Sequence, residues 1–152
     1  MVAARSRDVG CSMRARTQFF ALALLLGACA QPPDLTDESI ELITQVNDVR
    51  AGICMCAEDA GYDSMVACGD AVGLVGESER LCVTTVLEDL GDDGADYLAC
   101  VTAAYTDGAS CLLANTDCAT GQVSTCEQAR EAAVAACSQI PTSDALAFEA
   151  CL

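Results

Sequence analysis

Two segments of the sequence have the same length and begin and end with Cys: CVTAAYTDGASC at residues 100–111 and CEQAREAAVAAC at residues 126–137. An α-helix turns about 100° per residue, so two Cys that are about three turns apart lie on the same helical face. Both segments are therefore predicted to be helical, each with its two Cys on one face.

The spacing also predicts how these two helices pair. If the chain reverses direction near Cys118, the helices run antiparallel and their Cys faces come opposite each other. The prediction is a C-terminal helical hairpin, about 95–113 against 124–139, with the disulfides Cys100–Cys137 and Cys111–Cys126. The pattern resembles the twin C-x9-C helical hairpins, whose two helices are joined by two such bridges. Because the spacing here is longer by one residue, the resemblance implies a geometry and no function.

The rest of the chain also has helical patterns. Apolar side chains recur every three or four residues from Asp37 to about Cys56, which is typical of one face of a helix. Several Gly between Glu58 and Gly76 indicate a loop with one short helix around residues 64–71.

Caps and turn residues place the remaining helices. Ser78 is a candidate N-cap for a helix that ends before a turn, GDDG at 91–94. Ser124 and Glu127 have the spacing of a capping box at the start of the second Cys segment, and Ser143 is a candidate cap for a last short helix. No stretch alternates as a strand does, so the predicted fold class is all-α, a small disulfide-stapled helical bundle.

The beginning of the sequence has the pattern of an export signal. Four Arg between residues 5 and 16 precede the uncharged run FFALALLLGA at 19–28. A helix of this length, at about 1.5 Å per residue, is too short to cross a hydrocarbon core about 30 Å thick. A short apolar run behind positive charges is typical of a secretory signal. Met13 directly precedes the compact part of this signal and is a candidate for the true start.

The apolar run ends in LGAC at 26–29, which resembles the bacterial lipobox. The resemblance implies that residues 1–28 are removed as a signal peptide and that Cys29 carries a lipid. Residues 29–36 would then be a lipidated tether, and residues 37–152 a cysteine-rich helical domain.

The resemblance to lipoproteins also implies a location. In the Gram-negative lipoproteins with this motif, Asp after the lipidated Cys favours the inner membrane, so Ala30 favours the outer membrane. We therefore expect an exported protein of the cell envelope, attached to the membrane by its N-terminal lipid. The wider resemblance, carried by the lipobox and by segments such as DYLACV at 96–101, is to small cysteine-rich, acidic, helical bacterial lipoproteins. That group implies no activity.

The number of Cys favours disulfides. Without Cys11 and Cys29 the chain keeps an even number in an oxidising compartment, which predicts five bridges. The ten Cys are Cys54, Cys56, Cys68, Cys82, Cys100, Cys111, Cys118, Cys126, Cys137 and Cys151. Outside the hairpin their pairing is not specified, because six Cys allow 15 arrangements.

Metal or redox use of the Cys is the alternative to this disulfide framework. Structural zinc sites favour C-x-x-C or His spacings, and the sequence has neither. The close pair in CMC at 54–56 is the one candidate for a metal-thiolate or dithiol site. Its two Cys point to different sides of the chain, which favours bridges to two different neighbours. We therefore predict no metal site and no cofactor.

Charge and composition exclude several functions. The chain has 23 acidic residues and seven Arg, no Lys and no His, and a formal charge of −16. Such a chain has no basic surface to neutralise phosphates, so nucleic acid is not an expected partner. Ser-His, Cys-His and Lys nucleophile arrangements cannot be assembled, so we predict no catalytic residues and no enzyme.

Three classes of function remain. The preferred prediction is a non-catalytic, membrane-anchored envelope or surface lipoprotein that acts as an interaction or structural module, with an unidentified protein partner. The alternatives are an envelope metal-binding or thiol-redox protein and a saposin-like carrier of a lipid or small ligand.

Overall fold

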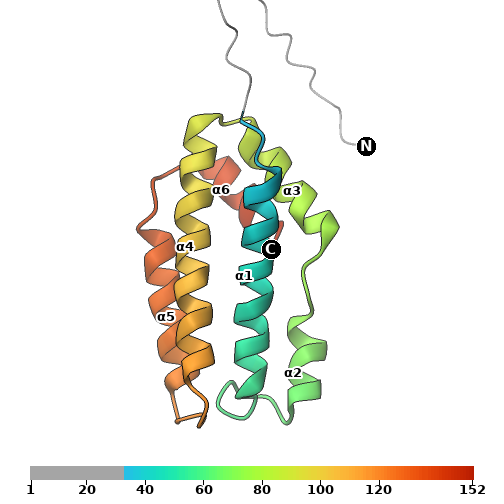
Figure 1. Cartoon of the computed structure of the whole chain (residues 1–152), viewed down its shortest axis with the longest axis vertical. Coiled ribbons are helices and arrows are strands. Elements are labelled where there is room, and N and C mark those ends of the chain that lie inside the picture. The colour runs from blue at the N-terminus through green and yellow to red at the C-terminus, as the bar shows by residue number, and fades with distance from the viewer. Residues whose placement is uncertain (1–32) are drawn as a thin grey trace, which may run out of the picture. The chain divides into compact units, whose positions relative to one another are not determined.

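Six α-helices make up residues 33–152, the part of the chain that the computed structural model describes (Figure 1). They are α1 (Thr36–Met55), α2 (Met65–Val72), α3 (Glu77–Glu88), α4 (Asp92–Ala114), α5 (Gln122–Ala135) and α6 (Thr142–Glu149). No strand occurs between residues 33 and 152, and the predicted all-α, disulfide-stapled bundle is confirmed. The predicted signal peptide, Cys11 and the predicted lipidation site Cys29 lie outside the described residues.

The two longest helices, α1 and α4, lie side by side and run in the same direction (Figure 1). Helix α5 returns along α4, so these two helices form the predicted hairpin. Helices α2 and α3 together return along the other side of α1, and α6 packs against α3.

Helix α4 is longer than predicted and α5 is shorter. The first turn of α4 includes Asp92 and Asp93, whose negative charge suits the N-terminal end of a helix. The expected GDDG turn is therefore wrong beyond Gly91, which precedes the helix with a positive φ of 61°. Helix α5 ends at Ala135 instead of continuing to about residue 139.

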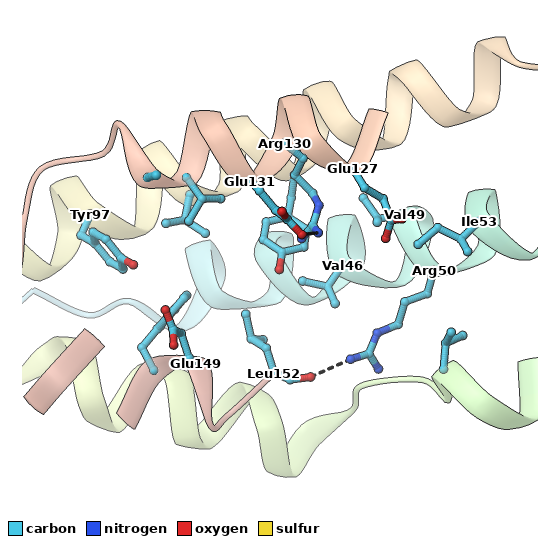
Figure 2. A pocket seen from close by; sticks show the side chains of 16 residues that line it. Val46, Val49, Arg50, Ile53, Tyr97, Glu127, Arg130, Glu131, Glu149 and Leu152 are labelled. Carbon is cyan, nitrogen blue, oxygen red and sulfur yellow. Dashed lines mark hydrogen bonds and ion pairs between the residues drawn. The ribbon is translucent and has the colours of Figure 1, made fainter. Parts of the chain in front are cut away.

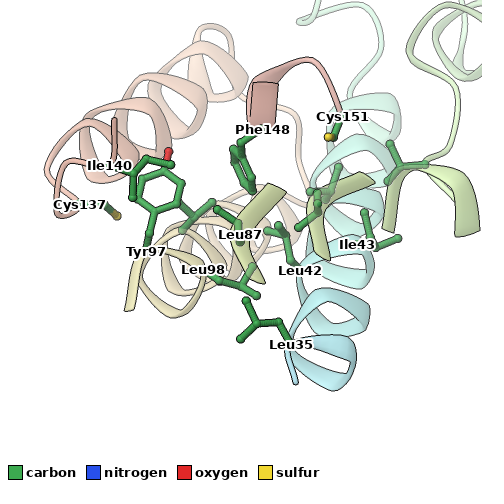
Figure 3. Packing of buried hydrophobic residues seen from close by; sticks show 14 residues of the cluster. Leu35, Leu42, Ile43, Leu87, Tyr97, Leu98, Cys137, Ile140, Phe148 and Cys151 are labelled. Atoms are coloured by element: carbon green, nitrogen blue, oxygen red, sulfur yellow. The ribbon is translucent and has the colours of Figure 1, made fainter. Parts of the chain in front are cut away.

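The larger hydrophobic cluster joins α1, α3, α4 and α6 (Figure 3). Leu42, Leu87 and Leu98 are fully buried in it, and each such side chain contributes about 1.5–3 kcal/mol on burial. Tyr97 and Phe148 meet edge to face, with ring centroids 5.3 Å apart and planes at 82°. This aromatic contact packs the short helix α6 against the long helix α4.

A second cluster fills the opposite end of the bundle, where α1, α4 and α5 converge. Val49 and Ile53 of α1 pack there near Leu112 of α4 and Val123 of α5. Gly52 allows this approach, because a Cβ at that position would lie 2.8 Å from the Cβ of Leu112. The core therefore consists of two clusters, and Tyr105 of α4 packs against both of them.

The start of α5 is capped from a distant part of the sequence. One carboxylate oxygen of Asp59, in the connection after α1, accepts the backbone N–H of Gly121 at 2.6 Å, and the other accepts that of Val123 at 3.0 Å. The capping box predicted at Ser124 is wrong, since α5 begins two residues earlier and the Ser124 hydroxyl donates to the carbonyl of Gly121. The carboxylate of Asp59, which is distant in the sequence, therefore caps α5 in place of the predicted Ser124 side chain.

Two other predicted caps are also wrong, and one short helix lies close to its expected place. Helix α3 begins before Ser78, at Glu77, where the Glu79 carboxylate accepts the N–H of Gly76 at 2.9 Å. Ser143 lies inside α6, which begins after Pro141. The short helix α2 starts after Ser64, whose hydroxyl accepts the N–H of Ala67 at 3.1 Å.

Substitution of Asp59 by Ala is expected to lower the melting temperature at pH 7. The N–H groups of Gly121 and Val123 hold the pKa of Asp59 below its ordinary value. A lowered pKa stabilises the native state above the unfolded value, about 3.9, and this contribution is lost as the pH falls through the folded value. The difference from the wild type should therefore shrink as the pH is lowered from 7 towards 2.

Circular dichroism melting curves across this pH range check the expectation. Asp63→Ala is the matched control, because Asp63 is an exposed carboxylate in the same connection. A melting-temperature difference for Asp59→Ala that stays constant with pH, or that equals the control's, would show that this cap is not electrostatic.

Candidate functional site

All ten Cys of the described residues are joined as disulfides. The pairs are Cys54–Cys68, Cys56–Cys118, Cys82–Cys151, Cys100–Cys137 and Cys111–Cys126. Their Cα atoms are 5.2 to 5.8 Å apart, within the usual range for this bond. The last two pairs are those that the spacing of the hairpin predicts.

The other three disulfides connect helices outside the α4–α5 hairpin to other parts of the chain. Cys54 is joined to α2, whereas Cys56 is joined to the α4–α5 connection, so the two Cys of the CMC sequence do bond to different neighbours. Cys82 of α3 is joined to Cys151, just after α6. Within residues 33–152 no Cys thiol is left for a metal or a redox cycle, and no group of three or more metal-ligating side chains occurs there.

A groove of about 680 Å³ lies between α1 and α5, over α4 and next to α6 (Figure 2). We call it the central groove. Its volume is in the range of small-molecule binding sites. It is lined by Val46, Val49, Arg50 and Ile53 of α1, Val72 of α2, Tyr97, Val101 and Tyr105 of α4, Glu127, Arg130, Glu131, Val134 and Ala135 of α5, and Phe148, Glu149 and Leu152.

The groove exists because α5 packs on α4 and leaves α1 uncovered on this side. Its apolar lining belongs to both core clusters: Val46 and Val101 to the larger, Val49 and Ile53 to the smaller. Tyr105, which packs against both clusters, lies between these two sets. These four side chains are at most 9% exposed, so the groove lies over the buried core and leaves little of it in contact with solvent.

Arg130 is the most unusual residue of the groove. Its side chain is 15% exposed, and its guanidinium carbon lies 4.8 Å from the centre of the Tyr105 ring. Its aliphatic part crosses α4 at Gly108, where a Cβ would come within 3.0–3.2 Å of it. Gly108, which lies within the continuous helix α4, therefore makes room for the side chain of Arg130.

The hydrogen-bonding capacity of Arg130 is not used up within the described chain. Its Nε atom is buried and has no hydrogen-bond partner there. The nearest carboxylate oxygen, of Glu131, is 3.7 Å away, too far for a hydrogen bond, and the Glu131 side chain is 69% exposed. Arg130 is thus a largely desolvated cation that an anion in the groove would stabilise.

A second Arg lies on the opposite wall of the groove. Arg50 of α1 donates to the backbone carbonyl oxygen of Leu152 at 2.6 Å (Figure 2). This bond holds the segment after α6 against α1. Arg80, the third Arg of the described residues, is paired with Glu77 on α3 at 2.6 Å and does not line the groove.

The ionisable hydroxyl of Tyr97 is not suited to proton transfer near neutral pH. Burial raises the pKa of Tyr97 above its ordinary value, with smaller contributions from Glu149 and Tyr105. The hydroxyl therefore stays protonated.

Two features of the sequence are signals of this groove. Only three Arg follow Cys29, so each is rare enough to mark a special position. Gly108 also interrupts a helical segment at a site where helix propensity alone disfavours it. A Gly in one helix and an Arg in the next, on the facing side of a stapled hairpin, indicates a large side chain that crosses a small one.

No protein-family model, curated protein sequence or solved structure matches this chain. Among the described helices, none has the length and apolar character needed to cross a membrane.

Proposed function

We propose that this protein is an exported, non-catalytic binding module that a lipid on Cys29 attaches to the cell envelope, on the outer membrane of a Gram-negative bacterium. The observation that carries the proposal is the use of all ten described Cys in disulfides. Such a framework is typical of oxidising compartments. The predicted signal and the resemblance of LGAC to a lipobox support the same location.

Charge limits what the domain itself can bind at the envelope. Of the 23 acidic residues, 22 follow Cys29, against three Arg. A protein with this excess of negative charge is repelled by nucleic acid and by anionic headgroups. The tether would thus hold the domain at a membrane surface that the domain itself does not bind.

Of the two alternative functions, the structure favours the carrier of a small ligand. The central groove has the volume and the apolar lining that such a ligand needs. The metal-thiolate or redox alternative lacks support, because the two Cys of the CMC sequence are bonded to Cys68 and Cys118. A membrane-tethered binding module would hold such a ligand in the central groove.

Membrane attachment is tested by the variant Cys29→Ser. We expect the wild type in the membrane fraction and the variant in the soluble exported fraction, because the thiol that accepts the lipid is gone. Cys11→Ser is the matched control, since it removes a Cys that lies upstream of the predicted cleavage site. Cell fractionation and the mass of the N-terminal peptide give the readout. If Cys29→Ser were exported and remained wholly in the membrane fraction, the lipid anchor would be rejected.

A further inference from the structure

A second pocket, of about 580 Å³, lies at the end of the bundle where α1 ends and α2 begins (Figure 1). We call it the end pocket. Its lining comes from the end of α1 and the connection that follows, from the start of α2, and from the α4–α5 connection. The disulfides Cys54–Cys68 and Cys56–Cys118 join these segments, so the pocket is held in shape by covalent bonds.

The apolar side chains at the end pocket are exposed to solvent, unlike those of the central groove. Met55 and Met65 line the pocket and are 47% and 60% exposed, and Val66, the next residue of α2, is 74% exposed. Helix α2 as a whole is poorly covered, since only Cys68 of its eight residues is buried. Exposed apolar side chains grouped around a cavity are typical of an interaction site. Met is flexible, which lets such a site adapt to the side chains of a partner.

The charges around the end pocket are all negative. Glu58 and Asp59 line it, and the exposed Asp63 lies in the same connection between α1 and α2. Both oxygens of Asp59 are used at the start of α5, whereas Glu58 is exposed. Residues 51–79 and 81–129 contain no Arg or Lys that could offset these charges. A partner that is complementary to this surface therefore has positive charges next to apolar side chains.

The end pocket lies far from the point where the described chain enters the bundle. The chain enters α1 after Leu35, at the opposite end of that helix (Figure 1). Helix α1 has 20 residues, which corresponds to about 30 Å at about 1.5 Å per residue. A lipid on Cys29 would attach the domain at the Leu35 end. The end pocket would then stay away from the membrane, which favours a soluble partner.

We propose that the end pocket binds a basic amphipathic helix of another polypeptide, with the apolar face of that helix on Met55, Met65 and Val66 and its Lys or Arg side chains towards Glu58. An amphipathic helix places apolar side chains on one face and charges beside them, which is the pattern that this surface matches. The proposal names the partner of the proposed binding module, and its test does not depend on the lipid anchor.

Three synthetic peptides of about 18 residues provide the first test, by calorimetric titration of the wild-type protein with all disulfides intact. One has Leu on one helical face and Lys on the other; the second has Glu in place of Lys, and the third has Gln in place of Leu. We expect the Leu–Lys peptide to bind with a stoichiometry of one and at least about tenfold more tightly than either of the others. Salt at about 0.15 M, where the Debye length is about 8 Å, limits the general attraction of the acidic surface for Lys. Equal binding of the Leu–Glu or the Gln–Lys peptide would overturn the proposal.

Substitution of the two exposed Met provides the second test. Met55→Ser with Met65→Ser should lower the affinity for the Leu–Lys peptide about 10- to 100-fold, because the partner loses two apolar contacts. Ile40→Ser with Leu146→Ser is the matched control, since these side chains are 48% and 62% exposed and lie outside the end pocket. The control should leave the affinity unchanged. An unchanged affinity in the Met variant, or an equal loss in the control, would overturn the proposal.

The charge of Glu58 is tested separately. Glu58→Gln should weaken the binding of the Leu–Lys peptide and make it less dependent on salt, because one carboxylate beside the pocket is removed. Glu38→Gln is the control, since Glu38 is exposed in the first turn of α1, at the other end of that helix. The same salt dependence in the wild type and in Glu58→Gln would contradict the predicted position of the Lys side chains.

Other occupants of the end pocket give different results. A second copy would appear as a dimer in sedimentation that the Met55→Ser, Met65→Ser variant dissociates. A membrane would appear as binding of the unlipidated Cys29→Ser protein to phosphatidylcholine vesicles. Either result would overturn the proposal. A protein that is exported and anchored as proposed but binds none of the peptides would reject this class of partner and leave the proposed location in place.

Discussion

Replacement of both Cys100 and Cys137 by Ser is expected to lower the free energy of unfolding by about 3–4 kcal/mol. The bridge closes a loop with a sequence separation of 37 and confines the unfolded chain accordingly. Cys111–Cys126 remains and shortens the effective loop, which keeps the loss near the lower end of this range. The double variant avoids the unpaired thiol that a single replacement would leave.

Urea denaturation followed by circular dichroism measures this loss. The slope of the transition should also increase, because the unfolded state without this bridge exposes more surface. The exposed neighbours of the two Cys provide a control, Ala99→Ser with Ser138→Ala, which should change stability by less than about 0.5 kcal/mol. Membrane attachment should persist in both variants. A loss below about 1 kcal/mol would mean that the Cys100–Cys137 disulfide contributes little to holding the two helices of the hairpin together.

Replacement of Gly94 by Ala is expected to destabilise the protein by about 3 kcal/mol, which is at the upper end for overpacking. Gly94 is buried in the first turn of α4, where the chain passes close to the end of α3. A Cβ there would collide with the backbone carbonyl oxygen of Leu87, and it would also lie 3.1 Å from the Cβ of Leu90. Backbone atoms cannot give way as a flexible side chain can, so α3 and α4 would have to separate.

Gly69→Ala in α2 is the matched control for Gly94→Ala. A Cβ at Gly69 meets no atom within 4 Å, and the residue is exposed in a helix. Ala favours a helix over Gly by up to about 1 kcal/mol, so this variant should be neutral or slightly more stable. Thermal and urea unfolding of the two variants side by side gives the comparison. Equal effects of the two substitutions would contradict the close contact between α3 and α4.

The parts of the fold that the sequence predicts are those with local periodicity. The stripe of α1 and the C-x10-C spacing of the hairpin both depend on the helical repeat, which is fixed by backbone geometry. The pairings of Cys100 and Cys111 follow from that repeat and one reversal of the chain. The pairing of Cys82 with Cys151 could not be predicted, because it depends on α6 packing against α3 across a sequence separation of 69.

Helix starts were predicted poorly for a related reason. Local rules assign the cap of α5 to Ser124, but the carboxylate of Asp59, which is 62 residues from Gly121 in the sequence, accepts the N–H groups of Gly121 and Val123 at an earlier helix start. A distant carboxylate with two short hydrogen bonds is a stronger acceptor than a neighbouring hydroxyl. Ser78 and Ser143 show that a suitable residue near a helix start does not fix the first residue of the helix.

The groove could not be predicted for a third reason. It depends on α5 packing mainly on α4 and only at one end near α1, and an arrangement of this kind has no pattern in the sequence. Once the hairpin is known, Gly108 and Arg130 are recognisable as a small residue opposite a large one. Arg130 is then recognisable as a mostly buried cation in a chain that is acidic overall.

The most direct test of the account is the number of free thiols in the protein isolated from the cell envelope without reduction. The protein is denatured, treated with an alkylating reagent and weighed by intact mass spectrometry, and it is then compared with a sample that was first reduced. The account predicts no alkylation of the ten Cys from Cys54 to Cys151 before reduction and alkylation of all ten afterwards. Two or more reactive thiols among them in the native protein, or a metal ion bound through them, would contradict it.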